Sequence, residues 1–231
     1  SGLDALLHGE KQPSDLLFPQ GDLSGVEDIY SGNRLFDPAN EQVAETVMDA
    51  LDRMEPIGRR LRILEIGAGV GGTTAAVLPT LSDEVEYFYT DLSTAFLRRG
   101  SSRFGERVQT ATLDIERDPV KQGFRAGGFD LVLAANVLHA TGDLDGALEN
   151  IKMLLAPNGR LVLAEMVAPS PVYTVIFGVT KQWWPKDERR LPHGPLLAPA
   201  TWQRVLAEHG LQATLSEDVA RPGAMAVITC T

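Results

Sequence analysis

Two residues that lie far apart in the sequence could form a catalytic pair. His139 follows an apolar stretch at 129–135 that is typical of a buried strand, and Glu165 ends a second such stretch at 160–165. Ligands bind at the carboxyl ends of parallel strands, and neighbouring strands lie about 4.8 Å apart. If these two strands are neighbours, Glu165 can hold one nitrogen of His139 while the other nitrogen removes a proton from a substrate. The alternative is a buried histidine and a strand-end glutamate with structural roles alone.

A glycine-rich turn follows an earlier apolar strand at 61–66. It runs Glu65-Ile66-Gly67-Ala68-Gly69-Val70-Gly71-Gly72, and Thr73 then opens a helix. Such a turn lets the backbone approach a ligand closely, and the helix N-terminus offers free N–H groups to an anion. The run fits both the GxGxxG pattern of dinucleotide-binding proteins and the ExGxGxG pattern of S-adenosylmethionine (SAM) enzymes. The glycines alone do not distinguish these two, and a turn that only packs helix against strand is a third alternative.

Acidic residues end three successive strands and favour SAM over NAD. Glu65 can hold an ammonium group, Asp91 can accept from both hydroxyls of a ribose, and Asp114 suits an adenine amino group, with Ile115 packing on the ring. The Tyr-x-x-x-Lys pair that many NAD-dependent reductases use is absent from the sequence. We therefore expect a cationic, adenosine-bearing cofactor and no metal. Each aspartate taken singly could also be a simple cap on the turn that follows it.

Further polar and aromatic residues are candidates for the ligand pockets. Asn136, just after the strand at 129–135, could donate to SAM or to a methyl acceptor, although as a turn former it needs no function. Trp183 and Trp184 could line the acceptor pocket or contact a sulfonium by cation–π attraction, or simply form a hydrophobic lid. The other histidines are expected to be structural or solvated: His8, His193 and His209.

The elements that must position these residues alternate between strand and helix, which predicts an α/β fold with a largely parallel sheet. Strands are expected at 61–66, 86–90, 108–113, 129–135 and 160–165, and helices at about 38–54, 71–81, 93–104, 143–155 and 200–209. Pro157-Asn158-Gly159 is expected to close the helix at 143–155.

The last part of the sequence breaks this alternation. Prolines among aromatic residues predict a pocket-covering lid insertion at about 166–199. The runs 211–219 and 224–230, joined at Arg221-Pro222-Gly223, predict a terminal hairpin that gives a seven-stranded sheet with one late antiparallel strand. We expect residues 1–59 to form a small N-terminal helical cap or lid and residues 60–231 to form the cofactor-binding core.

Composition narrows the class of protein. The 231 residues include 44% hydrophobic and 23% charged residues, which is typical of a globular domain, and the net charge of −10 argues against nucleic acid as a partner. Cys230 is the only cysteine, so no internal disulfide framework can form, and the sequence contains neither a signal pattern nor a run of apolar residues long enough to cross a membrane. We expect a cytoplasmic protein without membrane contact. The start at Ser1-Gly2 leads us to expect a fragment of something longer.

Several motifs together carry a resemblance to a known family. They are Leu64-Glu65-Ile66-Gly67-Ala68-Gly69-Val70-Gly71-Gly72-Thr73-Thr74, Tyr89-Thr90-Asp91-Leu92-Ser93, Leu113-Asp114-Ile115-Glu116, Gln122-Gly123-Phe124, Asn136-Val137-Leu138-His139-Ala140-Thr141, and Phe177-Gly178 with Trp183-Trp184. These motifs cover most of residues 60–210 and resemble the methyltransferase domains of modular polyketide synthases. Leu16-Leu17-Phe18-Pro19 and Ile29-Tyr30 extend the resemblance weakly toward the N-terminus.

The resemblance implies the class I SAM-dependent methyltransferase fold, which is Rossmann-like, and an acyl carrier protein as partner. In that family the acceptor is a polyketide intermediate on the carrier's phosphopantetheine arm, and the flanking domains belong to the same synthase. Most members methylate the α-carbon of a β-ketoacyl thioester, and a related group methylates a β-hydroxyl oxygen. The family's catalytic histidine and its glutamate partner fall on His139 and Glu165. Carriers are acidic in general, so an acidic chain must dock one through a local patch, for which Arg189-Arg190 is a candidate.

The resemblance also assigns residues to the two ligands. The cofactor residues are Glu65, Gly67, Ala68, Gly69, Gly71, Thr73, Asp91, Leu92, Asp114, Ile115 and Asn136. The acceptor residues are Tyr30, Phe177, Trp183 and Trp184. The family's glycine before the paired tryptophans is replaced by Gln182, and the region ahead of the glycine turn is short for the lid of many carbon-methylating members. Methylation of the α-carbon is the first hypothesis, methylation of a β-hydroxyl oxygen is the second, and a SAM-binding but non-catalytic domain is the third.

Overall fold

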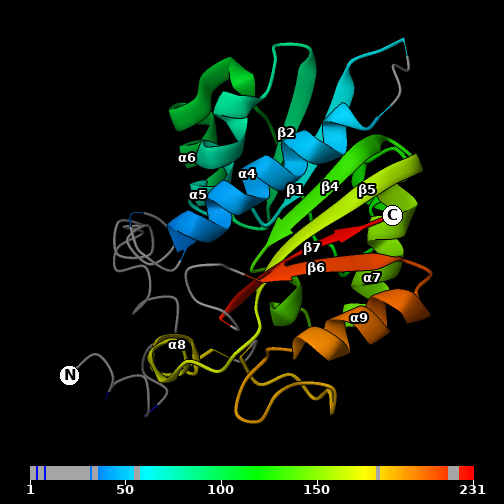
Figure 1. Cartoon of the computed structure of the whole chain (residues 1–231). Helices are drawn as coiled ribbons and strands as arrows, with labels where there is room; N and C mark the ends of the chain where they lie inside the picture. The colour runs from blue at the N-terminus through cyan, green and yellow to red at the C-terminus, as the bar shows by residue number, and fades with distance from the viewer. Residues whose placement is uncertain are drawn as a thin grey trace.

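Strands of the described residues form one mixed seven-stranded sheet in the order β3-β2-β1-β4-β5-β7-β6 (Figure 1). The structure is a computed structural model that describes residues 4, 8, 32, 36–54, 58–180, 183–217 and 224–231. The strands are β1 (Leu61–Ile66), β2 (Val85–Asp91), β3 (Gln109–Thr112), β4 (Phe129–Ala135), β5 (Leu155–Met166), β6 (Ala213–Glu217) and β7 (Met225–Cys230). The first five strands pair in parallel, whereas β7 is antiparallel to both β5 and β6. The predicted fold class and the inserted antiparallel strand are therefore confirmed.

Helices cover both faces of this sheet, as Figure 1 shows. They are α4 (Phe36–Asp52), α5 (Gly72–Val77), α6 (Thr94–Phe104), α7 (Leu144–Leu154), α8 (Pro171–Phe177) and α9 (Pro199–Glu208). Alternate residues of the central strands feed two apolar clusters. Ile63 packs with α4 and α5 on one face, and Leu64 packs with α7 and α9 on the other. Burial on both faces explains why the central strands are almost continuously apolar.

The helix α4 belongs to the core of the sheet. Val43 and Val47 are fully buried and pack with Leu131 and Val162 of the central strands. This apolar cluster therefore includes residues from both sides of the predicted domain boundary at residue 60. Most of the residues before α4 lie outside the described part of the chain, including Tyr30. No helix among the described residues is long and apolar enough to cross a membrane.

Two predicted boundaries differ from the structure for local reasons. The helix predicted at 71–81 ends at Val77 and continues as a 3-10 turn over Leu78–Thr80, where Pro79 lies in the first turn. Pro157-Asn158-Gly159 does not close α7, which ends at Leu154. These residues lie inside β5 as a bulge between the pairs Phe129–Leu155 and Leu131–Arg160, and Asn158 has a φ of 64°. An asparagine tolerates this left-handed conformation, so the turn residues mark a bulge.

Candidate functional site

The glycine turn after β1 brings its backbone close to β4 and β2. Gly67 has a φ of 62°, and a Cβ there would lie 2.6 Å from a methyl carbon of Val137. Gly69 has a φ of 56° and has open space where its Cβ would be, apart from one carbonyl oxygen 3.9 Å away. The Tyr89 hydroxyl donates to the Gly69 carbonyl at 2.5 Å. The turn therefore needs glycine for its conformation and leaves an open side beside Gly69.

Glu65 is buried at the end of β1, beside this turn. Its side chain is 1% exposed, and its Oε2 accepts hydrogen bonds from Thr74 Oγ1 at 2.5 Å and from the Tyr87 hydroxyl at 2.7 Å. Burial raises the pKa of Glu65 to about 7, although the two hydroxyl donors oppose that shift. Neutral hydroxyls hold the carboxyl in place without matching its charge, so this group suits a cationic ligand.

Asp91 connects β2 to the glycine turn. Its Oδ2 accepts from the Gly69 N–H at 3.0 Å and its Oδ1 from the Ser93 N–H at 2.7 Å. Burial raises the pKa of Asp91, and these backbone hydrogen bonds oppose that rise. The aspartate therefore orders the turn while its carboxylate remains at the edge of the cavity beside Gly69.

A cavity of about 230 Å³ opens between these groups. Seven of the residues assigned to the cofactor line it: Glu65, Gly67, Ala68, Gly69, Thr73, Asp91 and Asn136. Phe36, Asn40, Phe96 and Phe177 also line it, of which the sequence analysis had assigned only Phe177, and to the acceptor. Asn40 accepts from the Thr73 hydroxyl at 2.8 Å, so α4 contributes directly to this wall. A carboxylate for an ammonium group, a second carboxylate at the next strand end and an open glycine turn fit the donor set that SAM requires.

Four residues assigned to the cofactor lie outside that cavity lining. Gly71 has a φ of 79°, and a Cβ there would meet the Phe104 ring at 2.7 Å, so it permits packing of α6. Leu92 is 65% exposed. Asp114 accepts from the Glu116 N–H at 3.1 Å and pairs with Arg117, which is the capping role left open above. Ile115 is buried in the cluster under α7.

The predicted pair of His139 and Glu165 is in contact. β4 and β5 are neighbours, and His139 Nδ1 lies 2.5 Å from Glu165 Oε2. Glu165 is fully buried, and its Oε1 accepts the N–H groups of Val137 at 3.2 Å and Leu138 at 2.9 Å. One carboxylate thus orders both the imidazole ring and the 3-10 turn η5 (Leu138–Ala140) that carries it. Among the described residues, no hydrogen bond to His139 Nε2 occurs, which leaves that nitrogen for a ligand.

Asn136 lies where the two sides of the site meet. It has a φ of 56°, its N–H donates to Ala164 at 2.7 Å, and its Oδ1 accepts from the Met166 N–H at 3.1 Å. These bonds tie the end of β4 to the end of β5. Asn136 lines the cofactor cavity and also a second cavity of about 110 Å³ that contains His139.

This second cavity is apolar and lies under the lid insertion. Phe177 and Trp183, two of the residues assigned to the acceptor, line it together with Phe36, Tyr173, Met166 and Leu196, which carry no such assignment. Phe36, Asn136 and Phe177 line both cavities, so the two are neighbours across a shared wall. Phe36 and Ala39 lie three residues apart on the buried face of α4. This helical spacing was the sequence signal that could have identified Phe36 as a buried residue.

The other aromatic and basic candidates lie elsewhere. Trp184 is 51% exposed and donates to the Gly178 carbonyl at 2.8 Å, so it does not line the cavity that Trp183 lines. Tyr30 lies outside the described residues. The Arg190 side chain is only 3% exposed and Arg189 is already paired with Asp145 and Asp187, so the two present little free charge, and the carrier-docking face stays a prediction.

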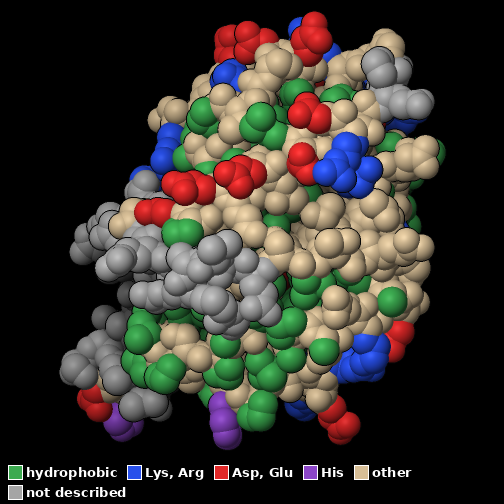
Figure 2. Space-filling model, viewed as in Figure 1, with side chains coloured by type: hydrophobic (Ala, Val, Ile, Leu, Met, Phe, Trp, Pro, Cys, Tyr) green, Lys and Arg blue, Asp and Glu red, His purple; other side chains and the backbone are tan. Residues whose placement is uncertain are grey.

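Apolar side chains extend from the lid to the surface. Figure 2 shows hydrophobic side chains gathered in the lower part of that view, around α8 and the insertion. Val172 and Val175 of α8 are 63% and 78% exposed, whereas Tyr173 and Phe177 of the same helix line the inner cavity. The lid helix is therefore apolar on both its inner and its outer sides.

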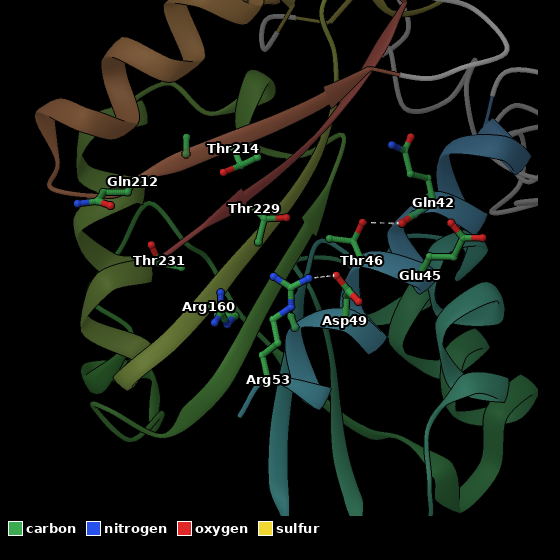
Figure 3. A pocket seen from close by; sticks show the side chains of 12 residues that line it. Gln42, Glu45, Thr46, Asp49, Arg53, Arg160, Gln212, Thr214, Thr229 and Thr231 are labelled. Carbon is green, nitrogen blue, oxygen red and sulfur yellow. Dashed lines mark hydrogen bonds and ion pairs between the residues drawn. The ribbon is translucent and has the colours of Figure 1, made fainter. Parts of the chain in front are cut away.

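A larger hollow of about 740 Å³ lies between α4 and the strands β6 and β7 (Figure 3). It is lined by Gln, Thr, Glu, Asp and Arg side chains, and Arg53 pairs with Asp49 at 2.6 Å within it. None of the predicted site residues reaches it. Because it lacks the glycine turn and the His139–Glu165 pair, we place the functional site at the two smaller cavities. In the described part of the chain no group of histidine, cysteine and acidic residues is arranged to hold a metal.

Comparisons with known proteins show what the chain is similar to. A family described as a methyltransferase domain matches residues 64–161. The polyketide synthase ThaQ of Burkholderia thailandensis is 37% identical over 224 residues, which cover 92% of this chain but only 11% of that synthase. The crystal structure of the CurJ carbon methyltransferase superposes with a TM-score of 0.91 at 38% identity, covering 99% of this chain and 63% of that one. The trans-methyltransferase CalH, in complex with SAH, gives a TM-score of 0.76 at 32% identity, with 98% and 63% of the two chains covered.

Proposed function

The chain belongs to the SAM-dependent methyltransferase domains of polyketide synthases, and from that premise we propose that it methylates the α-carbon of a β-ketoacyl thioester held by an acyl carrier protein. One observation carries the proposal. The cavity that contains the histidine of a buried His–Glu pair shares a wall with the cavity of the glycine turn. In this proposal the proton-abstracting group and the methyl donor occupy these neighbouring cavities, which supports methyl transfer between them.

The residues that hold SAM in this proposal come from the first three strand ends. Glu65 faces the ammonium group of the cofactor, Asp91 its ribose hydroxyls, and the open backbone of the turn lies against it. Asp114 and Ile115, at the third strand end, do not line the cofactor cavity, and their assignment to the adenine stays a prediction. When bound, SAM supplies a methyl group already activated by a positively charged sulfur. The protein therefore has to provide a nucleophile and to position it.

His139 acts as the base that converts the acceptor carbon into a nucleophile. Its Nδ1–H donates to Glu165, which leaves the Nε2 lone pair in the acceptor cavity. A proton on the carbon between a ketone and a thioester is acidic because both carbonyls share the resulting charge. Nε2 takes that proton, the C–H electron pair passes into the enolate, and Glu165 stabilises the imidazolium that forms.

The acceptor cavity favours such a substrate over a polar one. Phe177, Trp183 and Tyr173 give it an apolar lining that suits an acyl chain. A dry environment also strengthens the interaction between His139 and Glu165. The CurJ and DszA structures bear the name carbon methyltransferase, and their 38% and 40% identity to this chain supports carbon as the acceptor atom.

The partners follow from the same proposal. This chain matches segments of 11% and 9% of two much longer polyketide synthases, so we propose neighbouring synthase domains and a carrier protein that delivers the acyl chain. The exposed apolar residues of α8 lie on the outer side of the lid that covers the acceptor cavity. They support an entrance for a carrier-bound substrate near the lid.

A mass-labelling experiment tests the acceptor atom. The protein is incubated with SAM and a carrier-bound β-ketoacyl chain, and fragmentation of the product locates the added methyl group. Methyl on the α-carbon is the expected result. Methyl on oxygen alone would refute carbon methylation, and SAM binding without turnover across a panel of acyl carriers would favour a non-catalytic domain.

The matched variant is His139→Ala. It should abolish transfer while SAM affinity remains within about twofold, because His139 lines the acceptor cavity and not the cofactor cavity. Calorimetric titration with SAM and single-turnover assays measure the two quantities separately. A parallel loss of SAM affinity would indicate a structural histidine.

A further inference from the structure

Arg190 is a buried cation in the lid insertion that the proposed reaction does not yet use. Its side chain is only 3% exposed. Its backbone N–H donates to the Asp187 carbonyl at 3.1 Å in a short turn. Burial lowers the pKa of the Arg190 guanidinium, and the negative charges of Asp187 and Glu165 oppose that shift. Burying an arginine costs free energy unless hydrogen-bond acceptors match its N–H donors.

The guanidinium is matched mainly by backbone carbonyls of the catalytic turn. Its Nη1 donates to the His139 carbonyl at 2.7 Å, and its Nη2 donates to the Thr141 carbonyl at 3.2 Å. The turn η5, which contains His139, is thus held from its carbonyl side by a residue about 50 positions later. Its N–H side is held by Glu165, as described above.

The same nitrogen also holds the wall of the acceptor cavity. Nη1 donates to the Pro195 carbonyl at 2.7 Å, and Pro195 lines the cavity together with His139. One Nη1 group therefore joins the backbone of His139 to the backbone of Pro195 in the cavity wall. Nε makes no hydrogen bond among the described residues and lies 3.5 Å from Asp187 Oδ2 as an ion pair.

Arg189 provides a contrast at the next position. Its guanidinium forms a two-pronged pair with Asp145 on α7, at 2.8 Å for each prong, and also contacts Asp187. Among the described residues, its hydrogen bonds reach only Asp145 and Asp187, and none reaches η5 or Pro195. Two adjacent arginines of the same insertion thus bind different parts of the core, and only Arg190 reaches the catalytic turn.

We propose that Arg190 is a positioning residue that fixes His139 relative to the acceptor wall and so couples the lid insertion to the catalytic base. The inference rests on the proposed role of His139 as the base. A displacement of about 1 Å in a reacting group can cost about 100-fold in rate. Loss of the carbonyl clamp should therefore lower the rate of proton removal while the cofactor cavity, which Arg190 does not line, stays intact.

The experiment compares Arg190→Ala with Arg189→Ala in the full chain. For Arg190→Ala we expect kcat to fall by about 10- to 100-fold, SAM affinity to change less than about twofold, and added guanidinium to restore part of kcat. Arg189→Ala should keep kcat within about threefold and should not respond to guanidinium. Arg190→Lys, which keeps the charge but loses the forked donors, should be intermediate.

Two kinetic results would overturn the inference. One is an Arg190→Ala protein that folds and retains wild-type kcat. The other, for an alanine variant that fails to fold, is an Arg190→Lys protein with wild-type kcat. A readout without turnover separates this inference from the proposed function. The short His139–Glu165 hydrogen bond should give a downfield imidazole proton signal that Arg190→Lys shifts and Arg189→Ala does not. If the wild type shows no transfer, the proposed function fails, and an unchanged proton signal in Arg190→Lys would overturn the positioning role as well.

Discussion

Two glutamates end parallel strands of the same sheet, and both are almost fully buried, yet their surroundings differ. Glu65 at the end of β1 receives two neutral hydroxyl donors on one oxygen. Glu165 at the end of β5 receives two backbone N–H groups on one oxygen and an imidazole on the other. The protein thus matches the carboxylate of Glu165 with its own groups, whereas no cation among the described residues pairs with Glu65.

This difference assigns the two cavities to different tasks. A carboxyl whose pKa lies near 7 through burial gains most from a cationic ligand, because the ligand supplies the missing charge. A carboxylate already bonded to a histidine can instead orient that ring and stabilise its protonated form. In the proposed function, cofactor binding therefore depends mainly on the β1 side of the site and proton transfer on the β5 side.

The largest expected effect comes from Glu165→Gln. The amide oxygen at this position can still accept hydrogen bonds, but the amide carries no charge to stabilise an imidazolium at His139. We expect kcat to fall by about 100- to 10,000-fold while SAM affinity stays near that of the wild type. Rapid-quench measurement of the methylated product and calorimetric titration with SAM check the two parts. Turnover close to that of the wild type would remove the distinction between the two glutamates.

Glu65→Gln should produce the converse pattern with a smaller effect. A hydrogen bond to a charged group contributes about 1.5–3 kcal/mol, so SAM affinity should fall by about 10- to 100-fold. At saturating SAM, kcat should remain within a few-fold, because Glu65 does not line the acceptor cavity. An unchanged dissociation constant would show that the ammonium group is held elsewhere.

A third prediction concerns pH. The folded-state pKa of Glu65 is raised from 4.5 to about 7, so below pH 7 the cavity contains a neutral carboxyl group. Cation binding must then expel a proton, and SAM affinity should fall by at most about tenfold for each pH unit below 7. For the unliganded protein the sign is opposite. The neutral form is favoured by folding, so the contribution of Glu65 to stability is greatest below pH 4.5 and declines as pH rises through 7. Calorimetry in two buffers of different ionisation enthalpy measures the released proton, and Glu65→Gln should abolish it.

The β1 side of the site could be predicted from the sequence in some detail. The glycine turn and the strand-end acids are linear motifs, and parallel strands bring their ends to one edge of the sheet. Strand order was enough to bring His139 to Glu165. The strand-end position did not reveal the local contacts of Asp114, which follows the edge strand β3. Its carboxylate is engaged with Arg117 and Glu116 and does not line the cavity.

The β5 side could be predicted only in outline. The acceptor cavity draws Phe36 from α4, Tyr173 from α8 and Leu196 from the later part of the insertion. No short motif links these segments, because their proximity depends on how α4 and the lid pack against the sheet. For the same reason Arg190 was assigned to the surface, although its hydrogen bonds to distant carbonyls place it in the interior.

The smallest expected effect comes from Tyr87→Phe and concerns the pKa of Glu65. Tyr87→Phe removes one of its two hydroxyl donors, and because that hydrogen bond lowers the pKa of Glu65, its loss should raise the pKa further. The pH below which SAM affinity declines should therefore move upward, while the affinity at pH 9 changes by no more than about fivefold. Tyr89→Phe is the matched control, since it removes a hydroxyl from the same strand that bonds Gly69 and not Glu65. If both variants move the pH dependence equally, the shift reflects a general change in the glycine turn, and the hydroxyl donors of Glu65 do not set its charge.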